Sequence, residues 1–179
     1  MATKLEVYHG DITKLEVDVI VNAANKTLLG GVGVDGAIHA AAGPKLLAEC
    51  KALNGCLTGE AKITKGYNLP TGHIVHTVGP VYGRENGEED ELLAGCYNNS
   101  LSLAESVNAK TIAFPNISTG VFRYPKDEAA ELAVRTVQDY LAKHPDTSLE
   151  RVIFVSYTEP DFKIFKQEFE NLVDTNFNE

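Results

Sequence analysis

Two hydrophobic patterns alternate along the chain, and each predicts a different kind of element. Short runs rich in valine and isoleucine are apolar on consecutive positions, as expected for strands that are covered on both faces. Longer segments repeat their apolar residues every three to four positions, which is typical of helices that bury one face. The runs predict strands at residues 5–8, 17–21, 74–78, 111–114 and 152–155, with a weaker strand at residues 61–66.

Helices are predicted between these strands. A helical stripe starts at Leu92, and Pro125 and Pro160 stand where proline commonly opens a helix. Residues 36–42 and 44–53 form two short helical patterns, broken at Gly43 and Pro44. The alternation predicts an α/β protein with a three-layer α/β/α architecture and a mixed, mostly parallel central sheet. We expect one domain over residues 1–179, with its ligand site beyond the carboxyl ends of the strands.

Composition narrows the class of protein. The net charge of −9 argues against nucleic acid as the main partner, because duplex binding needs a positive patch. No apolar run reaches the length of a membrane span, and the first residues lack the apolar segment of a secretory signal. The three cysteines form no CxxC pair, which favours reduced thiols in a cytoplasmic protein. We expect a monomer, because no long heptad pattern is present.

The loop after the first predicted strand contains Asp11, flanked by Gly10 and followed by Ile12 and Thr13. A carboxylate beside a glycine can accept a hydrogen bond from an exocyclic amine, while the adjacent main chain meets the edge of a ring. The alternative is an ordinary turn in which Asp11 caps the main chain.

The loop after the second strand carries a more specific combination. Asn22 and Asn25 precede a glycine-rich stretch, residues 30–33, and a helix follows with Asp35 in its first turn and His39 four residues later. Glycines allow close approach of the main chain, and the N–H groups at a helix start can hold a diphosphate. The spacing fits neither a Walker-type P-loop nor the GxGxxG fingerprint.

A third loop, residues 114–125, resembles the second in composition. Ser118, Thr119 and Gly120 offer N–H and O–H donors, and Phe122 offers an apolar surface for a sugar or base. Alone, this is an ordinary connection between a strand and a helix. Two such loops at one edge of the sheet predict a clamp that holds phosphates through main-chain donors, which an acidic protein needs if its ligand is anionic.

The blocks in these loops resemble the macro domain family, in its MacroD type. They cover most of residues 10–125, and their joint occurrence is far more specific than any one of them. The blocks are Gly10-Asp11-Ile12-Thr13, Val19-Ile20-Val21-Asn22-Ala23-Ala24-Asn25, Val34-Asp35-Gly36-Ala37-Ile38-His39, Ala42-Gly43-Pro44, His76-Thr77-Val78-Gly79-Pro80 and Ile117-Ser118-Thr119-Gly120-Val121.

The resemblance implies that ADP-ribose lies across the sheet edge. Asp11 would receive the adenine amine beside the main chain of Ile12, and Tyr157 would stack on the adenine. Asn22 and Asn25 would border the distal ribose, with Asn25 bonded to its hydroxyls, and Asp35 would face the same sugar. The residues expected to hold the diphosphate are Gly31, Val32, Gly33, Val34, Ser118, Thr119, Gly120, Val121 and Phe122.

The resemblance also implies a hydrolase of ADP-ribosyl esters, on glutamate or aspartate of proteins and in O-acetyl-ADP-ribose. Asp35 can orient or deprotonate a water molecule, with Asn22 and Asn25 beside it, and loop N–H groups can stabilise developing charge. We expect no cofactor and no metal, since His73 and His76 are three apart on a strand and face opposite sides. His39 is interpreted as a structural neighbour of Asp35.

Two departures from the family pattern bear on activity. Related loops commonly have four glycines before Val-Asp-Gly, where this chain has Val32 in the third place. If that place requires positive φ, valine shifts the loop or stores about 1–3 kcal/mol of strain; otherwise its side chain crowds the distal ribose. Phe122 and Arg123 stand where Tyr-Gly is common, and we expect Arg123 to point to solvent.

Three functions therefore remain open from the sequence. The first is the hydrolase, which Asp35 favours. The second is a module that binds ADP-ribose without turning it over, which Val32 favours. The third is a regulator of a protein or RNA partner that merely retains the fold.

Overall fold

The computed structural model describes residues 2–177. Strands and helices follow the predicted order, with one added short 3-10 helix, η1. The elements are β1 (Lys4–His9), η1 (Ile12–Lys14), β2 (Val19–Ala24), α1 (Gly33–Ala42), α2 (Pro44–Ala52), β3 (Ala61–Lys65), β4 (His73–Val78), α3 (Glu89–Ser106), β5 (Thr111–Phe114), α4 (Lys126–Lys143), β6 (Arg151–Ser156) and α5 (Glu159–Phe177).

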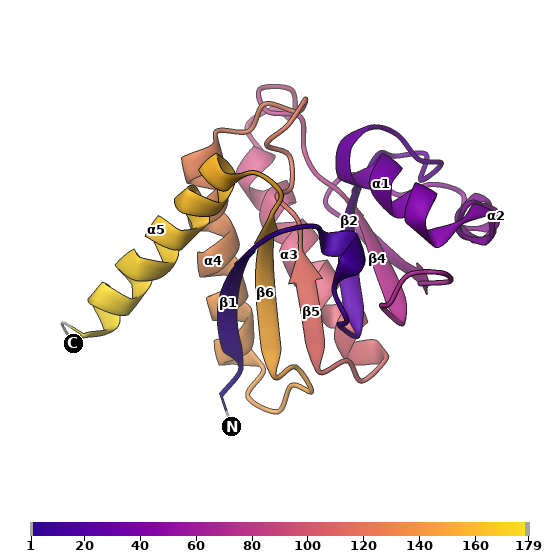
Figure 1. Cartoon of the computed structure of the whole chain (residues 1–179). Helices are drawn as coiled ribbons and strands as arrows, with labels where there is room; N and C mark the ends of the chain where they lie inside the picture. The colour runs from indigo at the N-terminus through magenta and orange to yellow at the C-terminus, as the bar shows by residue number, and fades with distance from the viewer. Residues whose placement is uncertain (1, 178–179) are drawn as a thin grey trace.

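The six strands form one sheet in the order β1-β6-β5-β2-β4-β3 (Figure 1). Neighbouring strands from β1 across to β4 pair in parallel, and β3 alone runs antiparallel, against β4. The prediction of a mixed, mostly parallel sheet is therefore confirmed. Because the carboxyl ends of β1, β6, β5, β2 and β4 meet at one edge, the loops that follow them gather there.

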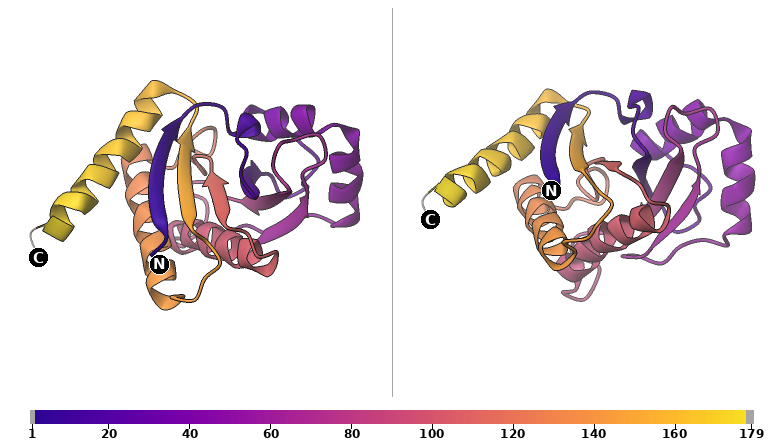
Figure 2. Two further views of the ribbon diagram at one scale, coloured as in Figure 1. Left: turned by 60° about the horizontal axis from the view of Figure 1, so that its bottom comes forward. Right: turned by 90° about the horizontal axis from the view of Figure 1, so that it is seen from below.

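Helices cover both faces of the sheet and give it three layers (Figure 2). Val19 and Val21 of β2 point into a core shared with α3, α4 and α5, whereas Ile20 between them joins the core under α1 and α2. All three side chains are fully buried, which explains why the strand is apolar on consecutive positions. None of the described helices is long and apolar enough to cross a membrane.

Two differences from the predicted element boundaries lie at the candidate site. Strand β2 continues through Asn22 to Ala24, because these residues pair in register with residues 76–78 of β4. Helix α1 begins at Gly33 rather than near Gly36, with Val32 as its N-cap. The first shift brings Asn22 onto the sheet, and Asp35 lies in the first turn of the helix as predicted.

The three cysteines are free and buried. Burial raises the pKa of the Cys50 thiol and of the Cys96 thiol to about 11 in each case, and it also raises the pKa of Cys56. A thiol needs its ionised form to react as a nucleophile, so burial keeps all three unreactive. Their role here is to pack the core.

Candidate functional site

A cavity of about 980 Å³ lies at the carboxyl ends of the parallel strands. This volume is at the upper end of the range for sites that bind small molecules. It lies between the loops that follow β1, β2, β5 and β6. Its lining comprises Gly10, Asp11, Ile12, Thr13, Ala23, Ala24, Asn25, Gly31, Val32, Gly33, Val34, Asp35, Ala37, Gly79, Pro115, Asn116, Ser118, Thr119, Gly120, Val121, Phe122, Val155, Tyr157 and Asp161.

The structure brings the residues singled out from the sequence to this one cavity, with a single exception. Asp11, Ile12 and Tyr157 lie among the lining residues, and so do Asn25 and Asp35. The two loops predicted to hold phosphates, here called the phosphate loops, also line the cavity with residues 31–34 and 118–122. Asn22 is the exception. It is fully buried behind Asp35 and is not part of the lining.

No lysine or arginine is found among the residues that line the cavity. Lys126 contacts the lining from outside, where its Nζ donates a hydrogen bond of 2.7 Å to Oδ1 of Asp161. Arg123 is exposed and lies outside the lining, in agreement with its expected position. An anion in this cavity therefore depends on main-chain N–H groups and on neutral side-chain donors.

Such donors are present on two facing loops. The N–H groups of the first turn of α1, from Gly33 onward, have no acceptor within the helix. In the described part of the chain, no hydrogen bond uses the N–H groups of Thr119, Gly120, Val121 or Phe122. Together with the positive end of the α1 dipole, these groups favour a negatively charged ligand.

Val32 does not strain the glycine loop. Its main chain is extended, with φ −103° and ψ 172°, which a β-branched residue adopts readily. The positive φ values fall on its neighbours Gly30 (φ 93°) and Gly33 (φ 64°), where glycine is needed. The Val32 side chain is 78% exposed at the cavity mouth. It can therefore act on a ligand through steric crowding, and not through backbone strain.

The second phosphate loop turns at Ser118, which has a φ of 66°. The Ser118 hydroxyl is buried and has no hydrogen-bond partner in residues 2–177. It packs against Gly79 so closely that a Cβ atom there would lie 2.1 Å from Ser118 Oγ. Gly79 follows β4 and was missed as a site residue, although it stood in one of the quoted sequence blocks.

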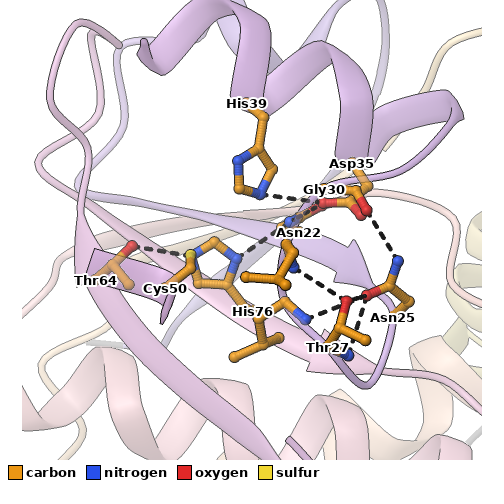
Figure 3. A network of polar contacts seen from close by, with 11 residues as sticks. Asn22, Asn25, Thr27, Gly30, Asp35, His39, Cys50, Thr64 and His76 are labelled. Carbon is orange, nitrogen blue, oxygen red and sulfur yellow. Dashed lines mark hydrogen bonds and ion pairs between the residues drawn. The ribbon is translucent and has the colours of Figure 1, made fainter. Parts of the chain in front are cut away.

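Asp35 is held by its surroundings and is only 4% exposed. Asn22 donates a hydrogen bond of 2.8 Å from Nδ2 to Asp35 Oδ1, and His39 Nε2 lies 3.5 Å from the same oxygen (Figure 3). No hydrogen bond to Asp35 Oδ2 is formed by the described residues. The expectation that Asn22 borders the ribose is thus corrected: Asn22 contacts the carboxylate from behind.

Asn25 lines the cavity, but most of its hydrogen bonds are made within its own loop. Its Oδ1 accepts hydrogen bonds from the N–H and hydroxyl of Thr27, at 3.1 and 2.6 Å, and from the Leu28 N–H at 3.2 Å. Its Nδ2 donates to the Gly30 carbonyl at 2.9 Å. The side chain therefore fixes the start of the glycine loop, with one Nδ2 proton left for a ligand.

At the opposite end of the cavity, Asp11 both caps a turn and faces the open space. Its Oδ1 accepts hydrogen bonds from the Thr13 N–H at 3.0 Å and from the Thr13 hydroxyl at 2.7 Å, as the N-cap of η1. The described residues provide no hydrogen bond to Oδ2. Tyr157 lies at the same end and is 78% exposed, which leaves a ring free for stacking.

Asn116 and Asp161 are polar lining residues that were not singled out from the sequence. Asn116 lies two residues after the end of β5, and its Oδ1 accepts a hydrogen bond of 3.2 Å from the Ser156 hydroxyl. Its place beside Ser118 in the third loop was a signal that could have identified it. Asp161 comes from the first turn of α5, and no pattern in the sequence links that turn to the loops after β2 and β5.

Known proteins resemble the chain closely. It is 52% identical to human ADP-ribose glycohydrolase MACROD2 over 183 residues, covering 100% of this chain but 43% of the relative, so it spans less than half of that protein. It is 54% identical over 171 residues to an O-acetyl-ADP-ribose deacetylase of Klebsiella pneumoniae, covering 93% of this chain and 97% of that one.

A solved structure also shares the fold of this chain. The Oceanobacillus iheyensis macrodomain, as a glycine-to-valine mutant with ADPR, superposes with a TM-score of 0.89 and 44% identity, over 95% of this chain and 94% of that chain. Other structures of that macrodomain carry an aspartate-to-alanine or an asparagine-to-alanine mutation. The family model described as Macro domain matches residues 21–133, more than half of the sequence, and the chain therefore belongs to the macro domain family.

Proposed function

We propose that this macro domain binds ADP-ribose along the cavity and hydrolyses ADP-ribosyl esters. The observation on which the proposal rests is the pairing of two loops rich in unused N–H donors around a cavity without a lysine or arginine in its lining. A diphosphate fits such donors, because each N–H group offers a partial positive charge without the desolvation cost of a buried ammonium. A central diphosphate leaves one nucleoside end and one sugar end to be recognised.

The two ends of the cavity differ in the way that ADP-ribose requires. Asp11 offers Oδ2 to the adenine amine, and the exposed ring of Tyr157 offers a stacking surface. The other end carries Asp35 and the remaining Nδ2 proton of Asn25, which suit the hydroxyls of the distal ribose. The distance between these ends is spanned by the two phosphate loops.

Asp35 supplies the chemistry at the ribose end. Hydrolysis consumes one water molecule: the ester bond at the distal ribose breaks, one fragment takes the hydroxyl and the other takes the proton. Asp35 Oδ1 is occupied by Asn22, so Oδ2 is the oxygen left to orient the water and accept its proton. The loop N–H groups stabilise the negative charge that develops nearby, and the ligand's own phosphate assists.

The relatives support this substrate class. One relative is named an O-acetyl-ADP-ribose deacetylase and another an ADP-ribose glycohydrolase, and the match covers nearly the full length of the deacetylase. The mutated asparagine, glycine and aspartate of the Oceanobacillus iheyensis macrodomain are seven and three residues apart, the spacing of Asn25, Val32 and Asp35. The valine mutant of that protein was solved with ADPR, which supports binding in the presence of Val32.

We propose esters on protein glutamate or aspartate, together with O-acetyl-ADP-ribose, as substrates. Incubating the chain with a protein mono-ADP-ribosylated on glutamate tests this, with Asp35→Ala and the control Asp139→Ala in parallel. Asp139 is an exposed residue of α4 outside the cavity lining. We expect wild type and Asp139→Ala to remove the label, and Asp35→Ala to lose about 100-fold or more in kcat.

Calorimetry with ADP-ribose separates hydrolysis from binding. We expect Asp35→Ala to keep the ADP-ribose Kd within a few-fold, because the main-chain donors hold the diphosphate. Binding without removal of label by the wild type would instead identify a non-catalytic module, the second candidate, which the exposed Val32 at the ribose end favours. Absence of binding would overturn both.

A further inference from the structure

His76 lies outside the cavity lining, yet it is joined to Asp35 through a single residue. It is fully buried in β4, directly opposite Asn22 of β2 in the parallel register. Its Nδ1 lies 3.1 Å from Asn22 Nδ2, and its Nε2 lies 2.9 Å from the Thr64 hydroxyl (Figure 3). The series Thr64, His76, Asn22 and Asp35 therefore runs from the antiparallel edge of the sheet to the cavity.

The direction of each hydrogen bond in this series follows from the one at its end. The carboxylate of Asp35 can only accept, so the atom 2.8 Å from its Oδ1 must be the Asn22 amide nitrogen. The second proton of that nitrogen points at His76 Nδ1, which must then be unprotonated. A neutral His76 consequently carries its proton on Nε2 and donates it to the Thr64 hydroxyl, which donates in turn to the Lys65 carbonyl at 3.2 Å.

His76 stays neutral in this environment. Burial lowers its pKa to about 3, with the neighbouring His39 as a smaller cause in the same direction. Cys50 Sγ, 3.9 Å from Nε2, adds only a weak contact and no charge, because burial raises the pKa of that thiol. A protonated ring would place an N–H group against the Asn22 amide protons, so neutrality is also what the geometry requires.

We propose that His76 is a positioning residue that fixes the Asn22 amide and, through it, the orientation of the Asp35 carboxylate. The proposal deepens the function above and depends on Asp35 acting in hydrolysis. Asn22 Oδ1 is buried and has no partner in the described residues, so it does not resist a rotation of the amide by half a turn. Such a rotation would turn Oδ1 toward Asp35 Oδ1 and replace an attraction by a repulsion.

His76 Nδ1 opposes this rotation of the Asn22 amide. Only the amide nitrogen can donate to both acceptors, Asp35 Oδ1 and His76 Nδ1. The carboxylate is then held by Oδ1, and Oδ2 remains for the water. Loss of the acceptor at Nδ1 should therefore reduce turnover while sparing ADP-ribose binding, which uses the loops. A purely structural role would lower stability without separating kcat from binding.

The test compares substitutions that differ in this acceptor. His76→Leu fills part of the space without an acceptor, whereas Asn in His76→Asn carries an oxygen at the place of Nδ1. We expect His76→Leu to lower kcat at least about tenfold with the ADP-ribose Kd nearly unchanged, and His76→Asn to recover much of the loss. Equal kcat in wild type and a folded His76→Leu, or no recovery in a folded His76→Asn, would overturn the proposal.

A second pair of variants changes the acceptor of the His76 Nε2 proton. It tests the proposal if the His76 variants fail to fold. Thr64→Val removes the acceptor of the Nε2 proton and keeps the shape, and Thr64→Ser retains the hydroxyl. We expect nitrogen NMR of the wild type to report an unprotonated Nδ1 and a protonated Nε2 at neutral pH. Thr64→Val should weaken this preference and lower kcat several-fold, and Thr64→Ser should not. A wild-type spectrum with the proton on Nδ1 would refute the assignment.

Failure of the positioning role of His76 can be distinguished from failure of the hydrolase activity. If the wild type bound ADP-ribose but removed no label, the hydrolase proposal would fail. A crystal structure of His76→Leu would then decide the positioning role alone. A turned Asn22 amide with a displaced Asp35 carboxylate supports it, and an unmoved Asp35 overturns it.

Discussion

Gly31 lies so close to Asp35 that a Cβ atom on it would stand 3.0 Å from the carboxylate oxygen Oδ2. The same atom would lie 3.3 Å from Asn25 Nδ2. No positive φ is needed at this glycine, so the requirement is one of space rather than of conformation. Gly31 therefore keeps the Oδ2 side of Asp35 open and lets the loop lie close to Asn25.

Gly31→Ala should impair turnover more than it impairs folding. The new methyl group must push Asp35 Oδ2 aside, and Asn22 resists that movement by holding Oδ1. We expect kcat to fall about tenfold or more and the unfolding free energy to fall by about 1 kcal/mol. Gly72→Ala is the matched control, because its Cβ would meet only the Asp18 carbonyl at 3.5 Å. Equal kcat in both variants would contradict this steric reasoning.

Val32→Thr should have opposite effects on stability and on binding. Val32 is the N-cap of α1 and provides no side-chain hydrogen bond, although its extended conformation suits a capping residue. Threonine has the same shape, and its hydroxyl can accept from the N–H groups of Val34 or Asp35. We expect a gain of about 0.5–1 kcal/mol in stability and a weaker ADP-ribose Kd, because cap and diphosphate compete for the same donors.

Thermal unfolding and calorimetry on Val32→Thr and Val32→Ala check this competition. Alanine removes the branched side chain without adding a hydroxyl, so it separates steric relief from capping. A threonine variant that is both more stable and as tight a binder as alanine would show that the ligand does not use these donors.

Val32→Gly addresses the departure from the four-glycine loop. The structure excludes relief of backbone strain as a cause of any gain, since Val32 has φ −103°. We expect ADP-ribose affinity or turnover to rise because an exposed side chain leaves the cavity mouth. Stability should change by less than about 1 kcal/mol, because the added freedom of glycine in the unfolded chain opposes its better fit at the N-cap. Unchanged Kd and kcat, measured by calorimetry and label removal, would mean that the loop tolerates valine.

The fold was predictable because local pattern and tertiary burial agree in it. Val19, Ile20 and Val21 alternate between two cores, and both cores are apolar, so a consecutive apolar run identified the strand. The end of β2 was not predictable in this way. Asn22 belongs to the strand because His76 pairs with it, and that partner lies far along the chain.

The cavity was predicted in outline and less well in detail. Loops that follow parallel strands converge whatever their sequence, so Asp11, Asp35 and Ser118 were brought together by topology. The division of roles depends on individual hydrogen bonds: Asn25 organises its own loop, and Asn22 supports Asp35 from behind. The start of α1 was missed since glycines carry no helical signal, although Gly33 opens the helix.

Acidification should destabilise the protein through His76. Its pKa in the folded protein is lowered to about 3, whereas an unfolded histidine titrates near 6.5. Between these values the unfolded chain binds the additional proton, so the stability contribution is complete above pH 6.5 and declines as the pH falls toward 3. The decline should approach about 1.4 kcal/mol per pH unit.

The contribution of His76 is isolated by subtracting the pH dependence of the unfolding free energy of His76→Asn, because the asparagine side chain does not titrate. Chemical unfolding at several pH values from 7 to about 4 should give curves whose separation changes with the slope stated above. Parallel curves would mean that His76 has the same pKa in the folded and in the unfolded protein. Such a result would also weaken the neutral tautomer that positions Asn22.

Binding of ADP-ribose should not weaken as ionic strength rises. The ligand's two phosphate charges approach a chain of net charge −9, and no lysine or arginine lines the cavity to attract them. Salt therefore screens a repulsion, while the short hydrogen bonds to loop N–H groups are little affected. Calorimetry at low and at physiological ionic strength should give an equal or lower Kd at the higher salt, and Arg123→Ala should behave as wild type. A steep loss of affinity with salt would instead point to a side-chain cation, such as Lys126 released from Asp161.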